Sequence, residues 1–327
     1  MAAAALLMVG LGASPLGAAT ETLPQDLTGP DVVWLDFDNW IVPDDAVYGC
    51  TSLDHAIATG EVLSGYGPDE GNSSDQTDGF DTYALVTVNG EYFLNPDDTV
   101  DVADNTITTD VVNMGGLDVR IRHTALQSQP VLRTLVELTN PTDAALTQTV
   151  TFEQDLGSDG NTWVQTTSSG DDDWTAADRW AVTTEDEEPS FGDPVITTAL
   201  YGPGAIATPI SLLDLCGERW DLIEALAKDD TTAGGSSGGA GTAAVYSEAA
   251  QTSAAHFSVT VPAGQTRYLA FFNSATTDES LDPALAVTGL YDAGLTGALA
   301  EGLDPAVIPL VVNWAPAVVE LEPTFTG

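Results

Sequence analysis

A strictly alternating segment in the first half of the chain sets the strongest limit on the folds that this sequence can adopt. In LDVRIRHT (117–124), the odd positions hold Leu, Val, Ile and His, and the even positions hold Asp, Arg, Arg and Thr. Successive side chains of a β-strand point to opposite faces, so this period of two predicts a strand with one buried face and one exposed face.

Several other segments give strand signals. YALVTVNGEYFLN (83–95) predicts a β-hairpin, because its Asn-Gly pair at 89–90 favours the tight turns that join antiparallel strands. VLRTLVELTNPTDAALTQTVTFEQ (131–154) predicts two strands around an Asn-Pro turn, with Val150 and Phe152 facing inward. Further strands are predicted at 162–166, 179–184, 195–200, 256–261 and 267–272, the last two separated by a Pro-Ala-Gly turn. Many short strands at this spacing indicate an antiparallel sandwich or barrel, of which we expect a large β-sandwich.

Two segments depart from this pattern and predict one or two short helices. Ile210–Lys228 has apolar residues at helical spacing, and 282–302 is a second helix candidate that internal glycines weaken. Between them, residues 229–244 are rich in Gly and Ser, which is typical of a flexible loop. We expect residues 20–327 to form a single large domain of mainly β structure.

The charge of the chain excludes one class of partner. Fifty Asp and Glu residues face only seven Lys and Arg residues, which gives a formal net charge of −43. Binding a nucleic-acid backbone needs many cations that displace counterions, so a nucleic-acid partner is not expected. Self-repulsion destabilises such a compact chain, and salt at about 1 M would shorten the Debye length to roughly 3 Å. The composition therefore predicts adaptation to high salt; binding of many divalent cations stays open as the alternative.

The first residues predict export. Residues 1–19 form an apolar stretch with small residues near Ala18 and Ala19, which is typical of a secretory signal peptide, with an ordered apolar strand as the alternative. The usual basic residues are missing, which leaves open a start farther upstream. We expect a secreted or cell-surface protein without a membrane span. In an oxidising compartment, Cys50 and Cys216 could form one disulfide.

A short loop after the predicted strand at 150–154 is a candidate calcium site. DLGSDGN places Asp155, Asp159 and Asn161 around two glycines, and calcium takes six to eight oxygen ligands from loops of this kind. The bidentate Glu of an EF-hand is missing. Because the chain holds fifty carboxylates, a solvated loop joining two strands is the alternative, as it is for the acidic segments 95–105 and 168–178.

The arginines are candidate ligand-binding residues because they are rare. Arg120 and Arg122 share a face of their predicted strand, and Arg133 would join them beside Glu137 if the two strands pair. One interpretation is that they anchor local carboxylates and reduce repulsion. The other is a site for an anionic ligand such as a uronic acid, held by paired guanidinium contacts.

Three tryptophans could bind sugar. Trp163, Trp174 and Trp180 lie near carboxylates, and aromatic faces beside carboxylates suit carbohydrate rings; the alternative is that they fill the core. His123, on the apolar face of its strand, is expected to be an interior side chain. The nucleophile motif G-x-S-x-G is missing, and no pair of carboxylates can be selected from sequence as the acid and base of a glycosidase.

Two longer segments resemble a known structural group. GLDVRIRHTALQSQPVLRTLVELTNPTDAALTQTVTFEQDLGSDGNTW (116–163) and FSVTVPAGQTRYLAFF (257–272) resemble the β-supersandwich domains of secreted carbohydrate-active bacterial proteins, the galactose-mutarotase-like group. The shared features are long antiparallel strands, an LTNPT-type turn and a late VPAGQT turn. The resemblance implies a supersandwich-like fold. No catalytic His or Glu of that group aligns with a residue here, so no site is transferred.

These observations leave three classes of function open. The first is a non-catalytic extracellular module that binds a glycan or a cell-surface protein. The second is a carbohydrate-active enzyme on a supersandwich scaffold, and the third is a structural subunit of a surface layer or filament.

Overall fold

The computed structural model describes residues 18–22, 25–30, 32–37, 59–61, 80, 82–95, 99–156, 162–184, 194–205, 210–213, 252–276 and 280–314. Strands dominate this part of the chain, as the sequence predicts. They are β1 (Ala19–Thr22), β2 (Gln25–Gly29), β3 (Val32–Phe37), β4 (Thr59–Glu61), β5 (Thr82–Val88), β6 (Glu91–Tyr92), β7 (Thr99–Ala103), β8 (Thr106–Thr108), β9 (Val112–Met114), β10 (Leu117–Ala125), β11 (Val131–Thr139), β12 (Leu146–Asp155), β13 (Trp163–Thr167), β14 (Trp180–Thr184), β15 (Val195–Ala199), β16 (Ile210–Leu213), β17 (Thr252–Val261) and β18 (Thr266–Thr276).

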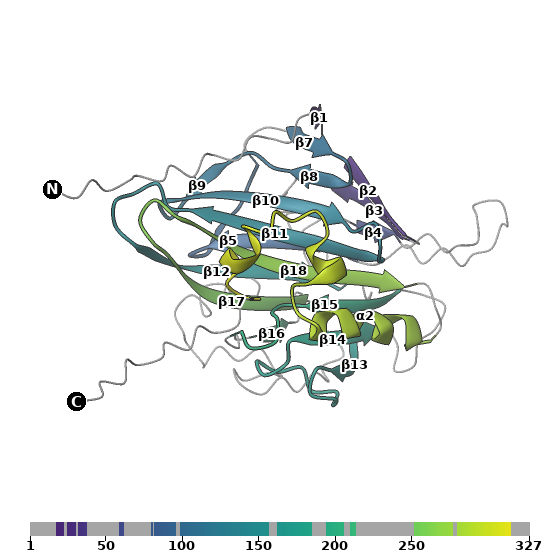
Figure 1. Cartoon of the computed structure of the whole chain (residues 1–327). Helices are drawn as coiled ribbons and strands as arrows, with labels where there is room; N and C mark the ends of the chain where they lie inside the picture. The colour runs from purple at the N-terminus through teal and green to yellow at the C-terminus, as the bar shows by residue number, and fades with distance from the viewer. Residues whose placement is uncertain are drawn as a thin grey trace, which may run out of the picture.

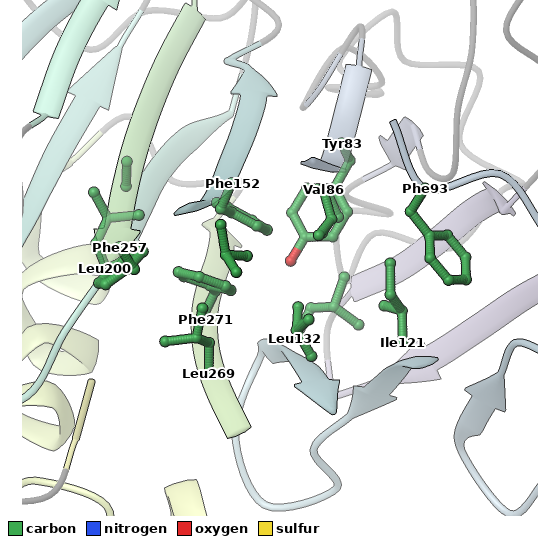
Figure 2. Packing of buried hydrophobic residues seen from close by; sticks show 14 of the residues in the cluster. Tyr83, Val86, Phe93, Ile121, Leu132, Phe152, Leu200, Phe257, Leu269 and Phe271 are labelled. Carbon is green, nitrogen blue, oxygen red and sulfur yellow. The ribbon is translucent and has the colours of Figure 1, made fainter. Parts of the chain in front are cut away.

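Two large antiparallel sheets pack face to face, with a small third sheet (Figure 1). The ten-stranded sheet has the order β1-β7-β8-β10-β11-β18-β15-β14-β13, with β9 paired to β10. The five-stranded sheet has the order β16-β17-β12-β5-β6, and the third sheet is β2-β3-β4. In Figure 2, Phe152 from one large sheet lies against Phe271 from the other, and their ring centroids are 4.0 Å apart. The predicted β-sandwich is confirmed.

The local strand signals correspond to observed elements. Asn89 and Gly90 join β5 to β6 with φ angles of 53° and 79°, the conformation of a type I′ hairpin turn. In β10, buried and partly exposed residues alternate along the whole strand. The period of two in the sequence therefore predicts correctly that one face of this strand is buried and the other is partly exposed.

Two turns of the chain cross between the large sheets. β11 and β12 belong to different sheets, as do β17 and β18, so neither pair forms a hairpin. Asn140 joins the two crossings: its backbone N–H donates to the carbonyl of Gln265 and its carbonyl accepts from the N–H of Gly264. Its side chain donates to the carbonyl of Val261. The LTNPT and VPAGQT turns are thus neighbours that close the same end of the sandwich.

The predicted helices are partly confirmed. Helix α2 (Asp282–Asp292) falls within the second candidate, and Gly294, with φ of 81°, follows its end. The first candidate, Ile210–Lys228, is wrong at its start, because β16 occupies Ile210–Leu213 and pairs with β17. Pairing with a neighbouring strand outweighs helical spacing here. Residues 214–228, the Gly/Ser-rich segment 229–244 and residues 1–17 of the expected signal peptide lie outside the described residues.

Helix α2 and the segment after it cover the outer face of the ten-stranded sheet (Figure 1). We call residues 295–314 the C-terminal strap; it contains the 3₁₀ turns η1 (Gly297–Ala300) and η2 (Ile308–Leu310). A second apolar core lies beneath this layer. As a result, β11 is buried on both faces over most of its length, unlike β10.

The strap completes the ten-stranded sheet where β15 stops. Asn313 accepts a hydrogen bond from the N–H of Ala270 and donates to the carbonyls of Ala270 and Leu200. The indole N–H of Trp314 also donates to the carbonyl of Ala270. A Cβ atom at Gly202 would lie 2.6 Å from Cε3 of Trp314, so only glycine fits this close approach.

Candidate functional site

A buried polar cluster lies between the two large sheets. Its members are at most 1% exposed: Tyr83, His123, Thr134, Gln154, Thr198 and Asn273. The Tyr83 hydroxyl crosses from β5 to the opposite sheet, where it lies 2.9 Å from Oγ1 of Thr134 and donates to Oδ1 of Asn273. Nδ1 of His123 lies 3.0 Å from the same Thr134 oxygen. Because these groups are closed to solvent, we assign them a structural role.

Local backbone geometry aims Tyr83 into this cluster. The pairing of β12 with β5 shifts between Glu153 and Asp155, and Ala84 in the bulged strand has φ of 55°. The extra residue reverses the alternation and turns the Tyr83 ring inward. Burial raises the pKa of Tyr83 and lowers the pKa of His123 to about 3, so both side chains are neutral at neutral pH. His123 is an interior side chain, as the sequence predicts.

Tyr83→Phe is expected to reduce the free energy of unfolding by about 1.5 kcal/mol, because it leaves Oδ1 of buried Asn273 without this donor. Denaturant unfolding measures the change. Tyr201→Phe is the control, since the Tyr201 hydroxyl donates to a single carbonyl, that of Ala176, in a partly buried position. An equal loss in both variants would contradict a special role for the contact between the sheets.

The accessible candidate site is a group of three charged residues on the outer face of the ten-stranded sheet, which we call the arginine face: Arg120, Arg122 and Glu137. Strands β10 and β11 pair with Arg120 opposite Glu137. Nη2 of Arg120 lies 2.9 Å from both carboxylate oxygens of Glu137, and Nη2 of Arg122 lies 2.6 Å from Oε2. The side chains of Arg120 and Arg122 are 20% and 32% exposed.

The arginine face carries an excess positive charge. Two guanidinium groups share one carboxylate, so the three residues together hold one net positive charge. The contacts with Glu137 use only Nη2 of each guanidinium, which has five N–H donors. Nε of Arg120 is buried, so Nη1 of each arginine and Nε of Arg122 remain for a ligand. The next carboxylate on the same face of β10, Asp118, accepts from the side chain of Asn113. Asp118 keeps its negative charge, because the amide that contacts it is neutral, so the excess positive charge belongs to Arg120, Arg122 and Glu137 alone.

Tyr268 and the strap border the arginine face. Tyr268 pairs with Glu137 across β11 and β18, and the residue is buried, with 9% of its surface exposed. Burial raises the pKa of Tyr268, and the charge of Glu137 raises it further. The backbone N–H of Val312 donates to the carbonyl of Tyr268, which fixes the strap beside this residue.

Arg133 lies away from Glu137, contrary to expectation. The two strands pair, but Arg133 is buried beneath the strap and donates to the carbonyls of Leu299 and Glu301. Burial lowers its pKa to about 10, so it stays charged at neutral pH. Register explains the difference: Arg133 pairs with Thr124, four residues along β10 from Arg120. Arg133 anchors the strap and does not belong to the arginine face.

The predicted tryptophan site is not assembled. Trp174 is 0% exposed and Trp180 is buried, with its indole N–H donating to Asp292 on α2, so neither presents an open ring face. Trp163 keeps partial exposure on the edge strand β13, where it pairs with Thr184 at the far end from Trp180. Strands β11, β18 and β15 separate the arginines on β10 from Trp180 on β14. The core interpretation holds for Trp174 and Trp180.

The candidate calcium loop is mostly outside the described residues. Asp159 and Asn161 are not described, and only the backbone of Asp155 is, at the end of β12. Within the described ranges, no group of three or more His, Cys, Asp or Glu could hold a metal ion. In the acidic segment 168–178, burial favours a higher pKa for Asp178, but hydrogen bonds from Thr175 and other loop donors lower it below its usual range. The Asp178 carboxylate therefore stabilises its own loop through these hydrogen bonds.

The expected disulfide also falls outside the description, because neither Cys50 nor Cys216 is among the described residues. Among the described helices, none is long and apolar enough to cross a membrane.

Sequence reasoning missed two features around the site. Tyr268 was only one of many strand aromatics, and the pairing of β11 with β18 is what brings it beside Glu137. Asn313 follows no motif, and its role depends on the carbonyls left open at the end of β15. Neither position carries a local sequence signal.

Comparison with known proteins adds little to this geometry. No protein-family model matches the sequence, and no curated protein matches it. Among solved structures, the chain is similar to a polysaccharide lyase, with a TM-score of 0.34 and a sequence identity of 11%. The match covers 82% of this chain and 33% of the lyase, so the chain spans about a third of that protein's length. A likeness of this size says nothing about activity.

Proposed function

We propose that this protein is an exported β-sandwich module that binds an acidic glycan, with the arginine face receiving a carboxylate of the glycan. The observation that carries the proposal is the arginine pair itself: in a chain with seven cationic residues, two lie side by side on a partly exposed surface and share one carboxylate. Export is suggested by the apolar segment at residues 1–19.

The chemistry of the site suits a uronic acid. A guanidinium group binds carboxylates through paired, charge-assisted hydrogen bonds that are stronger than neutral ones. The strap, whose Val312 N–H donates to the carbonyl of Tyr268, limits the site on one side. A sugar carboxylate satisfies the unfilled donors of Arg122 while Glu137 keeps the two arginines in place.

The net charge of −43 opposes the approach of any anion at long range. Salt at about 1 M reduces the Debye length to roughly 3 Å, which screens this repulsion but leaves direct contacts in place. The proposed binding therefore belongs to a salty medium, in agreement with the predicted adaptation to high salt.

Calorimetric titration with an oligogalacturonate and with its methyl ester tests the proposal, in about 1 M sodium chloride. The free acid is expected to bind and the uncharged ester to bind at least tenfold more weakly, because esterification removes the carboxylate that the arginines contact. Arg122→Gln should lower the affinity for the free acid by about tenfold or more.

Arg267→Gln is the matched control, because Arg267 contacts only Thr266 and Gln265 among the partners observed for it and lies outside the arginine face. It should leave the affinity within about twofold of the wild type. Equal binding of acid and ester, or an equal loss in both arginine variants, would rule out this site.

A further inference from the structure

We infer that Glu137 determines the charge of the ligand: it holds the arginine face at one positive charge, so that the site accepts a monoanion and discriminates against a dianion. This inference rests on the proposed function and adds the specificity of the same site. It makes Glu137 a specificity-determining residue in addition to an anchor for the two arginines.

The contacts of Glu137 give the charge balance. Its two oxygens receive Nη2 of Arg120 and Nη2 of Arg122 at 2.6–2.9 Å, so one of the two positive charges is already neutralised inside the site. A monoanionic group brings the site to neutrality. A dianionic group leaves it with a net negative charge, within a surface that is already strongly acidic.

The groups around Glu137 do not offset a second negative charge. Arg120 and Arg122 on β10 are already counted, and Tyr268 on β18 is neutral because burial raises its pKa. Asp304 in the strap adds to the negative side, since its charge also raises the pKa of Tyr268. Arg133, the next cation on this face, is buried and donates to strap carbonyls, so it is not available to a ligand.

Four hexoses that differ only at C6 separate charge from shape: galactose, galacturonate, galactose 6-sulfate and galactose 6-phosphate. The sulfate and the phosphate are both tetrahedral, but the sulfate carries one negative charge and the phosphate carries about 1.5 to 2 at neutral pH. At pH 8 the wild-type protein should bind galacturonate and the sulfate more tightly than the phosphate, by roughly fivefold to tenfold.

Glu137→Gln should reverse this order, because it raises the charge of the site from one to two while keeping hydrogen-bonding atoms in place. The affinity for the phosphate should rise by roughly tenfold, as expected for the loss of one adjacent like charge. Glu137→Asp keeps the charge and should keep the wild-type order. Asp118→Asn removes a carboxylate of the same strand face that accepts from Asn113, and it should raise the affinity for the phosphate less than Glu137→Gln does, because Asp118 does not contact the two arginines through the bonds that Glu137 makes.

A second measurement needs no variant. The second pKa of a sugar phosphate is about 6, so its charge changes from −1 to −2 between pH 5 and pH 8. The affinity of the wild-type protein for galactose 6-phosphate should fall over this range, while its affinity for the sulfate, a monoanion throughout, stays constant. This result remains decisive if Glu137→Gln does not fold.

The outcomes are distinct. If the wild-type protein binds none of the charged hexoses, nor the oligogalacturonate, the proposed function fails and this inference fails with it. If galacturonate binds and depends on Arg122, but the phosphate binds more tightly as its charge increases, the proposed function stands and the inference is overturned. An equal effect of Asp118→Asn and Glu137→Gln would also overturn it, since general surface charge would then explain the order.

Discussion

Asn313→Ala is expected to lower the free energy of unfolding by about 3 kcal/mol, one of the largest effects of any single substitution in the strap. The Asn313 side chain makes three hydrogen bonds to backbone groups of Ala270 and Leu200, all of them buried. Trp314 would still donate to the carbonyl of Ala270. The N–H of Ala270 and the carbonyl of Leu200 would lose their side-chain partner without access to water, which is the costly situation for a polar group.

Denaturant unfolding of Asn313→Ala beside Asn113→Ala measures this effect. Asn113 is exposed and donates to Asp118, so its replacement should cost less than about 0.5 kcal/mol. Similar losses in the two variants would show that the strap does not complete the sheet. A loss confined to Asn313→Ala would establish that the C-terminal segment is an integral part of the ten-stranded sheet.

The second large effect concerns salt. The melting temperature should rise by roughly 10 °C when sodium chloride increases from about 0.01 M to about 1 M, because repulsion among fifty carboxylates is screened as the Debye length falls from roughly 30 Å to roughly 3 Å. A rise of this size corresponds to about 3–4 kcal/mol of self-repulsion removed by screening, since each kcal/mol moves the melting temperature of a large domain by about 2–4 °C.

Calcium chloride at equal ionic strength is the control for this experiment. If sodium and calcium stabilise the protein equally, general screening accounts for the result. If micromolar calcium alone produces the rise and a chelator reverses it, a specific metal site is responsible, and Asp155, Asp159 and Asn161 become the first positions to substitute. An unchanged melting temperature in nearly ion-free water would contradict the salt adaptation predicted from composition.

Short-range sequence patterns predicted the strands well because they depend on neighbouring residues. The Asn89–Gly90 turn and the alternation in β10 follow from backbone geometry within a few positions. The assignment of strands to sheets was not predictable in the same way. β11 and β12 are joined by a turn that resembles a hairpin turn in sequence, yet they belong to different sheets, because each finds its partners far away in the chain.

In the candidate site, too, the features that depend on neighbouring residues were predictable and those that depend on distant segments were not. Period-two alternation placed Arg120 and Arg122 on one face and suggested Glu137 as a neighbour, and both features are present. Arg133 was expected to join this group if the two strands pair. They do pair, but their register places Arg133 opposite Thr124, and the overlying strap buries it. Burial by a segment more than 100 residues away in sequence leaves no local pattern, which also explains why Trp180 beneath α2 could not be distinguished from a surface tryptophan.

The most direct test of the proposed site is a two-dimensional NMR spectrum of the arginine Nε–H groups during titration with an oligogalacturonate. The chain contains six arginines, so at most six signals need assignment, and the variants Arg120→Gln and Arg122→Gln identify the two that matter. Saturable shifts of the Arg120 and Arg122 signals, with the Arg267 signal unmoved, are the predicted result. Signals that stay in place, or that all drift together with added ligand, would contradict carboxylate binding at the arginine face.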